Sequence, residues 1–182
     1  MNHSSDPDRQ PVFFEVGHDQ SARRIAVRAR EGAAPGLFWL GGFNSDMKGT
    51  KALALDAWAA EHGRACVRFD YSGHGESSGQ FAEGTIGRWL EESVAVFARF
   101  CRGPQVVIGS SMGGWMALLL AREIAKEADK GASVLTQTIV SVIPGPAQQE
   151  PGISQPSPPD SGFAPSGAPR NDGGTERPQH NT

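Results

Sequence analysis

The stretch QVVIGSSMGG, residues 105–114, decides the fold of this 182-residue chain. Its first four residues form a short apolar run, which is typical of a buried strand. The residues that follow match the pattern G-x-S-x-G, and an apolar helical pattern begins at Met112. In such a nucleophile elbow Gly109 and Gly113 let the strand and the helix approach closely, while Ser111 occupies the sharp turn between them. The stretch therefore predicts a strand, a strained turn and a helix, with Ser111 as the candidate nucleophile.

Apolar runs and helical patterns alternate along the rest of the chain. The first two runs are separated by a turn at 17–21 and predict a hairpin. Strands that alternate with helices after such a hairpin predict the α/β class with a mostly parallel sheet. The expected strands are 13–16, 24–30, 36–40, 65–71, 105–108 and 133–143, and the expected helices are 50–62, 85–101 and 112–128.

A loop rich in glycine follows the expected strand 36–40. It reads Gly41-Gly42-Phe43-Asn44, and its glycines allow the backbone to approach a bound substrate. In an elbow fold this loop supplies one oxyanion donor, and the residue after the nucleophile supplies the other. The expected donors are therefore the amides of Phe43 and Met112.

Two alternatives for these glycine motifs stay open at this point. Gly41 and Gly42 could serve only to turn the chain, and the serine motif could be a glycine-rich structural turn. A phosphate-binding loop is a weaker alternative, because the motif lacks the Lys-Ser/Thr ending that a P-loop requires.

Four blocks in order make the chain similar to a known family. They are GTKALAL (49–55), ACVRFDYSGHGESSG (65–79), TIGRW (85–89) and GPQVVIGSSMGGW (103–115). The chain resembles the α/β-hydrolase superfamily over about residues 12–128, and within it the branch of abhydrolase domain-containing protein ten, an acyl-protein thioesterase, and its bacterial relatives.

This resemblance implies an α/β-hydrolase fold and a serine esterase or thioesterase that acts on a small-molecule ester or acyl-thioester. It implies Ser111 as the nucleophile that forms an acyl-enzyme, with Phe43 and Met112 as the oxyanion donors. It implies no metal and no organic cofactor.

Three other residues near these motifs have ordinary structural interpretations. His74 lies in the loop after the expected strand 65–71, where a structural or pocket-rim role is expected rather than that of the catalytic base. Asp70 ends the same strand and is expected to organise the loop by hydrogen bonds. Trp115 follows the serine motif and is expected to pack in the core.

The partners of a serine triad are hard to place in this sequence. In this fold the order along the chain is Ser, then Asp or Glu, then His, and His180 is the one histidine after Ser111. The triad is therefore expected to be incomplete, as in a truncated product that lacks the last strands of the fold. The alternative is a non-catalytic fragment or binding protein that keeps the pocket. The acidic residues after Ser111 are Glu123, Glu127, Asp129, Glu150, Asp160, Asp172 and Glu176.

Composition divides the chain into two parts. Residues 144–182 hold nine of the 13 prolines and only two large apolar side chains. Such a segment cannot bury enough apolar surface to offset the entropy of ordering, so a disordered tail is expected there. The expected α/β-hydrolase domain is residues 11–143.

Charge and apolar patterning limit the possible partners. The net charge of −3 excludes the basic footprint of a nucleic-acid binder, and no apolar run is long enough for a membrane span. The N-terminus lacks the apolar region of a secretory signal, and Cys66 and Cys101 are expected to be buried free thiols. A cytoplasmic location is therefore expected. Self-association is also expected, because a sheet that lacks the last strands of the fold would leave apolar surface uncovered.

Overall fold

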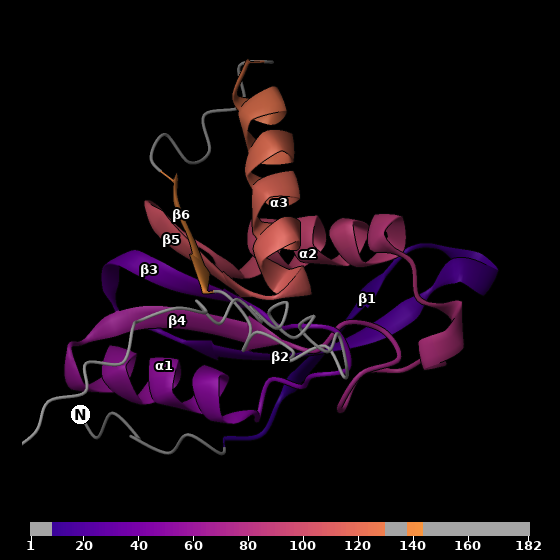
Figure 1. Cartoon of the computed structure of the whole chain (residues 1–182), viewed down its shortest axis with the longest axis horizontal. Coiled ribbons are helices and arrows are strands. Elements are labelled where there is room, and N and C mark those ends of the chain that lie inside the picture. Colours follow the sequence, from indigo (N-terminus) through magenta and orange to yellow (C-terminus); the bar gives the residue numbers. More distant parts are fainter. Residues whose placement is uncertain (1–8, 130–137, 144–182) are drawn as a thin grey trace, which may run out of the picture. The chain divides into compact units, whose positions relative to one another are not determined.

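Six strands form one sheet in the order β1-β2-β4-β3-β5-β6 (Figure 1). This computed structural model describes residues 9–129 and 138–143, all within the unit Met1–Ala147. Strands β1 and β2 form an antiparallel hairpin, β2 is antiparallel to β4, and β4, β3, β5 and β6 run parallel. The bounds are β1 Val12–Val16, β2 Arg23–Arg30, β3 Ala33–Leu40, β4 Arg64–Phe69, β5 Gln105–Ser110 and β6 Thr138–Ile143.

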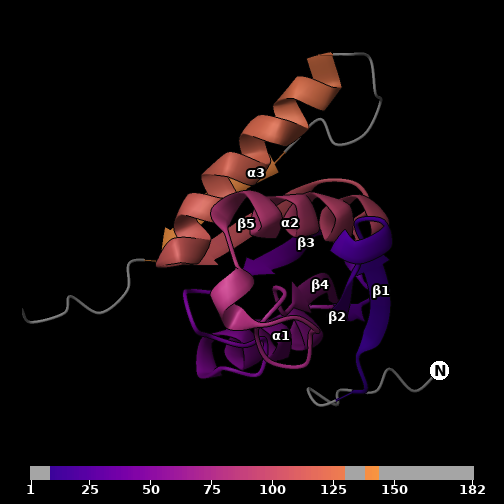
Figure 2. The same ribbon diagram turned by 90° about the vertical axis from the view of Figure 1, so that its right-hand side faces the viewer.

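Helices lie on both faces of this sheet. Helix α1 lies on one face, and α2 and α3 lie on the other (Figure 2). The bounds are α1 Thr50–Glu61, α2 Ile86–Phe100 and α3 Met112–Asp129, with single 3₁₀ turns η1 Asp19–Ser21 and η2 Phe81–Glu83. The expected α/β sheet with an N-terminal hairpin is confirmed.

Alternating side chains of the central strands supply the core on the two faces. In β3, Phe38 and Leu40 join the larger cluster, which includes Phe97 of α2 and Leu120 of α3. Leu37 points to the opposite face and packs with residues of α1. Because successive strand side chains alternate between faces, one apolar strand serves both layers. Parallel strands buried on both faces read as continuous apolar runs for this reason.

Element boundaries differ from the expected ones by a few residues. Strand β3 begins at Ala33, three residues early, and β5 continues through Gly109 to Ser110. Helix α2 begins after Thr85, whose side-chain hydroxyl accepts a hydrogen bond of 3.2 Å from the amide of Arg88. The last expected strand is described only over 138–143. The expected disordered tail, 144–182, lies outside the described residues.

Candidate active site

Ser111 lies in the turn between β5 and α3. It is exposed, and its φ is +54°, in the left-handed region that residues other than glycine seldom adopt. Its carbonyl accepts a hydrogen bond of 2.8 Å from the amide of Gly114, in the first turn of α3. Such a conformation costs on the order of 1–3 kcal/mol and persists only where the surrounding structure holds it. The turn thus presents the Ser111 hydroxyl at the carboxyl edge of the parallel strands.

The two glycines that flank Ser111 allow this turn to form. A Cβ atom on Gly109 would lie 2.1 Å from the carbonyl oxygen of Gly113, and a Cβ atom on Gly113 would lie 2.1 Å from the carbonyl oxygen of Leu40. Both distances are far below van der Waals contact. A side chain at either position would therefore force α3 away from β5 or β3.

The loop after β3 approaches the same turn. A Cβ atom on Gly42 would lie 3.5 Å from the Cβ atom of Ser111, so the backbone of this loop is in close contact with the turn. The next residue, Phe43, is 60% exposed, and its ring lies 4.9 Å from that of Phe81. Met112 begins α3, where helix N–H groups have no acceptor within the helix. The structure therefore brings the loop of Phe43 beside Ser111 and Met112.

Asp70 joins two of the loops at this edge of the sheet. Its buried carboxylate accepts hydrogen bonds from the amide of Met47 at 2.6 Å and from the amide of Glu76 at 2.8 Å. Burial raises the pKa of Asp70, and these two amide hydrogen bonds partly oppose that rise. The carboxylate is used by the loops after β3 and β4, which is the loop-organising contact that the sequence predicts.

His74 lies among aromatic rings. It is 5% exposed, and its ring centroid lies 5.1–5.7 Å from those of Tyr71, Phe81 and Trp89. Its Nδ1 lies 3.2 Å from the carbonyl oxygen of Ser72. In the described part of the chain its Nε2 has no hydrogen-bond partner. No hydrogen bond joins His74 to Ser111 within that part.

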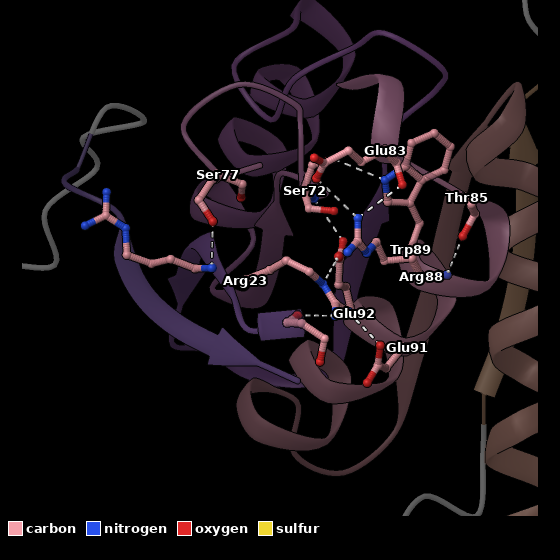
Figure 3. A network of polar contacts seen from close by, with 12 residues as sticks. Arg23, Ser72, Ser77, Glu83, Thr85, Arg88, Trp89, Glu91 and Glu92 are labelled. Atoms are coloured by element: carbon pink, nitrogen blue, oxygen red, sulfur yellow. Dashed lines mark hydrogen bonds and ion pairs between the residues drawn. The ribbon is translucent and has the colours of Figure 1, made fainter. Parts of the chain in front are cut away.

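An ion-pair network that is buried except at Glu91 holds the loop after β4 on α2. Figure 3 shows Arg23 of β2 between two carboxylates of α2, with its Nη2 2.6 Å from Glu91 Oε2 and its Nε 2.8 Å from Glu92 Oε1. Glu92 also accepts a hydrogen bond of 2.9 Å from the amide of Ser72, and Trp89 Nε1 donates to the Ser72 carbonyl at 3.1 Å. The sequence did not predict this network, because charged side chains are seldom fully buried.

A second cluster of buried charge lies under α1. Asp56 accepts hydrogen bonds from Arg30 at 2.9 and 3.0 Å, from Arg9 at 3.1 Å and from Arg68 at 3.3 Å. Burial alone would raise the pKa of Asp56, but the hydrogen bonds from Arg30 and the charges of Arg68 and Arg9 lower it below its usual value. This cluster fastens α1 to β2 and β4.

The partners that a triad would need are not at Ser111 in residues 9–129 and 138–143. Glu123 and Glu127 lie on α3, and Asp129 ends it. Glu123 pairs with Lys126 and Arg122. The expected acids of the tail and His180 lie outside the described residues.

The remaining expectations concern metals, thiols and exposed side chains. Among the described residues, no group of three or more His, Cys, Asp or Glu side chains could hold a metal ion. Cys66 and Cys101 are buried and free, and burial raises the pKa of each thiol to about 12. The expectation that Trp115 packs in the core is wrong. Its side chain is 56% exposed, as is that of Leu118 one turn later at 57%.

Comparison with known proteins identifies the class of this chain. The model of the alpha/beta hydrolase family matches residues 32–179. The chain therefore belongs to this family, and it has the α/β-hydrolase fold. The match reaches beyond residue 128, where the resemblance inferred from the sequence blocks ends.

Relatives within the family place the chain more closely. It is 38% identical over 135 residues to palmitoyl-protein thioesterase ABHD10, mitochondrial, of Homo sapiens, covering 73% of this chain and 44% of that protein. A putative hydrolase from Agrobacterium vitis S4 is 45% identical with a TM-score of 0.66, covering 74% of this chain and 51% of that one. Mouse alpha/beta hydrolase domain-containing protein 10 is 31% identical with a TM-score of 0.58, covering 71% and 48%. The chain thus spans about half the length of these relatives.

The comparison corrects the expected location. The mammalian relatives are named as mitochondrial, which contradicts the expectation of a cytoplasmic protein. That expectation rested on the missing secretory signal and on free thiols. Mitochondrial transit peptides also lack an apolar core, so these features do not separate the two compartments. Among the helices of the described residues, none is long and apolar enough to cross a membrane.

Proposed function

We propose that this chain carries the nucleophile of a serine hydrolase, with Ser111 as that nucleophile. The observation that carries the proposal is the left-handed conformation of Ser111 between a buried strand and a helix, with Gly109 and Gly113 in contacts that exclude any side chain. A strained, exposed serine at this point of an α/β-hydrolase sheet is what nucleophilic attack requires. Gly109 and Gly113 are the two small residues of the proposed nucleophile elbow.

The reaction proposed at this site is acyl transfer to water. The Ser111 Oγ attacks the carbonyl carbon of an ester or thioester, and the oxygen of the tetrahedral intermediate accepts hydrogen bonds from the amides of Phe43 and Met112. The alcohol or thiol leaves, and the acyl group stays on Ser111. Water then releases the acid and restores the serine.

The thioester is proposed as a substrate class because relatives in mammals are named palmitoyl-protein thioesterase. Exposed apolar side chains beside the proposed nucleophile are compatible with an apolar acyl group. Phe43 follows Gly42, whose backbone contacts the turn, and Trp115 follows Ser111 by four residues on α3. Both side chains are exposed. No metal or organic cofactor is needed for this chemistry.

One observation favours a second candidate, a non-catalytic protein that keeps the pocket. In the described part of the chain Ser111 has no histidine or acid as a hydrogen-bond partner, so its hydroxyl is not activated there. Removing the members of a triad lowers kcat by about 10⁶, and only the oxyanion hole and binding remain. We propose that the triad of this chain is incomplete, so that acylation of Ser111 is slow.

Labelling with a fluorophosphonate probe tests the proposal. We expect slow labelling of the wild-type chain, located at Ser111 by mass spectrometry and lost in Ser111→Ala. The control Ser21→Ala removes another exposed hydroxyl and should label as the wild type does. Labelling that survives Ser111→Ala would contradict the assignment of the nucleophile.

Two further measurements separate the candidates. The proposal predicts weak hydrolysis of p-nitrophenyl acetate, and a chain that never labels supports the non-catalytic protein. Robust turnover that is abolished both by Ser111→Ala and by His180→Ala would show instead that the tail supplies the base.

A further inference from the structure

The proposed oxyanion donor Phe43 lies in a tight turn that the chain closes by a hydrogen bond. The amide of Ser45 donates 3.2 Å to the carbonyl oxygen of Gly42, so Phe43 and Asn44 are the two central residues of this turn. Asn44 has a φ of +54°, which asparagine tolerates better than most residues do. Because a trans peptide group is planar, the Gly42 carbonyl and the Phe43 N–H point to opposite sides of one rigid unit. The direction of that N–H therefore depends on how the whole turn is held.

The backbone on the two sides of this turn does not fix its direction alone. Gly41 and Gly42 enter the turn, and glycine restricts the backbone dihedral angles less than any other residue does. On the other side, the carboxylate of Asp70 accepts a hydrogen bond from the amide of Met47, five residues after Gly42. That contact fixes the far end of the loop relative to β4. The turn itself needs a further contact to hold its direction.

The side chain of Phe43 makes that contact with the turn η2. Its ring centroid lies 4.9 Å from that of Phe81, with the two rings at 67°, and 6.4 Å from that of Trp89. The pair with Phe81 has the edge-to-face geometry that aromatic rings prefer, and such a contact is specific in direction. Phe43 is otherwise mostly exposed. Phe81 is therefore the aromatic side chain that holds the turn of Phe43 most closely.

The backbone of Phe81 is itself fixed from two sides. A Cβ atom on Gly73, whose φ is +76°, would lie 2.7 Å from the Phe81 Cα atom, so the loop after β4 lies directly against the start of η2. The amide of Gly84 donates a hydrogen bond of 3.0 Å to the Phe81 carbonyl oxygen. A Cβ atom on Gly84 would lie 2.1 Å from Cζ2 of Trp89, so the residue after η2 lies directly against that ring. Phe81 is thus held between the loop after β4 and helix α2.

Buried aromatic rings form a base for the ring of Phe81. The ring centroid of His74 lies 5.1 Å from that of Phe81, and the centroid of Trp89 lies 6.3 Å from it. Both His74 and Trp89 are buried. Trp89 Nε1 also donates a hydrogen bond of 3.1 Å to the Ser72 carbonyl oxygen (Figure 3), which fixes the plane of its ring. The exposed ring of Phe43 is therefore joined through Phe81 to side chains that the core of the domain holds in place.

We propose that Phe81 is a positioning residue for the amide of Phe43. Its ring holds the turn in the direction that the proposed oxyanion hole requires, before a substrate binds. This role rests on the proposed function, since attack by Ser111 is what gives the Phe43 amide an oxyanion to bind. A donor held in place stabilises charge that develops in the transition state, and an interaction made only there speeds the chemical step. Loss of the Phe81 ring therefore slows that step without weakening the binding of the reagent.

NMR relaxation of the full chain with ¹⁵N-labelled phenylalanine tests the positioning itself. The variant Phe43→Leu identifies the Phe43 amide resonance by its disappearance. In Phe81→Leu, which keeps an apolar side chain but removes the ring, we expect the order parameter of the Phe43 amide to fall from about 0.85 toward about 0.6. Phe81→Tyr restores the ring and should restore the order parameter. The control Phe13→Leu removes another exposed ring, on β1, and should leave the Phe43 amide unchanged.

Fluorophosphonate labelling measures the consequence at Ser111. The phosphonyl oxygen of the probe stands in for the oxyanion, and the dependence of the labelling rate on probe concentration separates the maximal rate kinact from the affinity KI. We expect Phe81→Leu to lower kinact about three- to tenfold, the factor that corresponds to the loss of one aromatic pair, with KI unchanged. Phe81→Tyr should restore kinact, and Phe13→Leu should label as the wild type does.

Each other outcome overturns a stated part of this reasoning. An unchanged order parameter of the Phe43 amide, or an unchanged kinact, in Phe81→Leu would overturn the positioning role. A raised KI with the same kinact would show instead that the Phe81 ring contacts the reagent. If Ser111 does not label in the wild-type chain, the proposed function fails, and the order parameter then decides whether Phe81 holds the Phe43 amide.

Discussion

Replacing Ser111 by glycine should stabilise the fold while it removes the proposed nucleophile. The φ of +54° at Ser111 costs a residue with a Cβ atom about 1–2 kcal/mol, and glycine avoids that cost. Glycine also gives the unfolded chain more freedom, which returns about 0.4–1 kcal/mol. Compared with Ser111→Ala, which keeps the Cβ atom, we expect Ser111→Gly to raise the free energy of unfolding by about 0.5–1 kcal/mol.

Urea unfolding followed by tryptophan fluorescence measures this difference from the two midpoints and a shared slope. Gly63 offers the matched opposite change. Its φ is +61°, and a Cβ atom on it would meet no atom within 4 Å, so Gly63→Ala adds backbone strain without a clash. We expect that variant to lose a similar amount of stability. If Ser111→Gly is no more stable than Ser111→Ala while Gly63→Ala is destabilised, the strain assigned to the turn is wrong.

Three more outcomes follow from the close packing at Gly113, the buried ion pairs of Asp56 and the exposed apolar side chains of α3. Gly113→Ala should lower the free energy of unfolding by about 1–3 kcal/mol, because its Cβ atom would overlap a carbonyl at the end of β3. The control Gly87→Ala, on α2, places a Cβ atom where no other atom lies within 4 Å and should not destabilise the chain in the same urea assay. Asp56 has a lowered pKa, so the stability from its pair with Arg30 is fully present above its ordinary pKa near 3.8 and is lost as the pH falls through the lower pKa of the folded state. Asp56→Asn should therefore reduce the loss of unfolding free energy at acid pH, and Glu61→Gln, at an exposed carboxylate on the same helix, should leave that loss unchanged. Trp115 and Leu118, the exposed apolar side chains of α3, should make the chain self-associate and bind the dye ANS. A monodisperse monomer in light scattering, together with no increase in ANS fluorescence, would contradict this.

The sequence predicts the order of elements well because buried parallel strands are continuous apolar runs. It underestimates the lengths of β3 and β5, because these strands continue through glycine or proline residues. Pro35 and Gly36 lie near the start of β3, and Gly109 lies near the end of β5. Such residues are uncommon inside strands. They are accommodated here because Pro35 lies near a strand end and Gly109 is needed for the approach of α3.

The turn at Ser111 was predictable because its geometry depends on the spacing of glycines along one segment. The surrounding contacts were not, because they join segments far apart in the chain. Arg23 and Glu92 are 69 residues apart, and each would be placed at the surface by its residue type. The prediction for Trp115 is wrong in the opposite sense, because this apolar residue was expected in the core and is exposed. An apolar side chain on a helix stays exposed when it points away from the sheet.

The precision of the proposed site comes from residues that do not take part in the chemistry. Asp70, at the end of β4, binds the amide of Met47 in the loop after β3 and the amide of Glu76 in its own loop. The first of these loops carries Phe43 and contacts the turn at Ser111 through Gly42, and the second carries His74. A carboxylate that accepts both amides fixes the two loops relative to β4, and an amide side chain at this position would present a donor where only acceptors fit. Preorganised donors stabilise a transition state only if they are held in place before the reaction, so the alignment of the proposed oxyanion donors depends on this buried carboxylate as much as on the turn at Ser111.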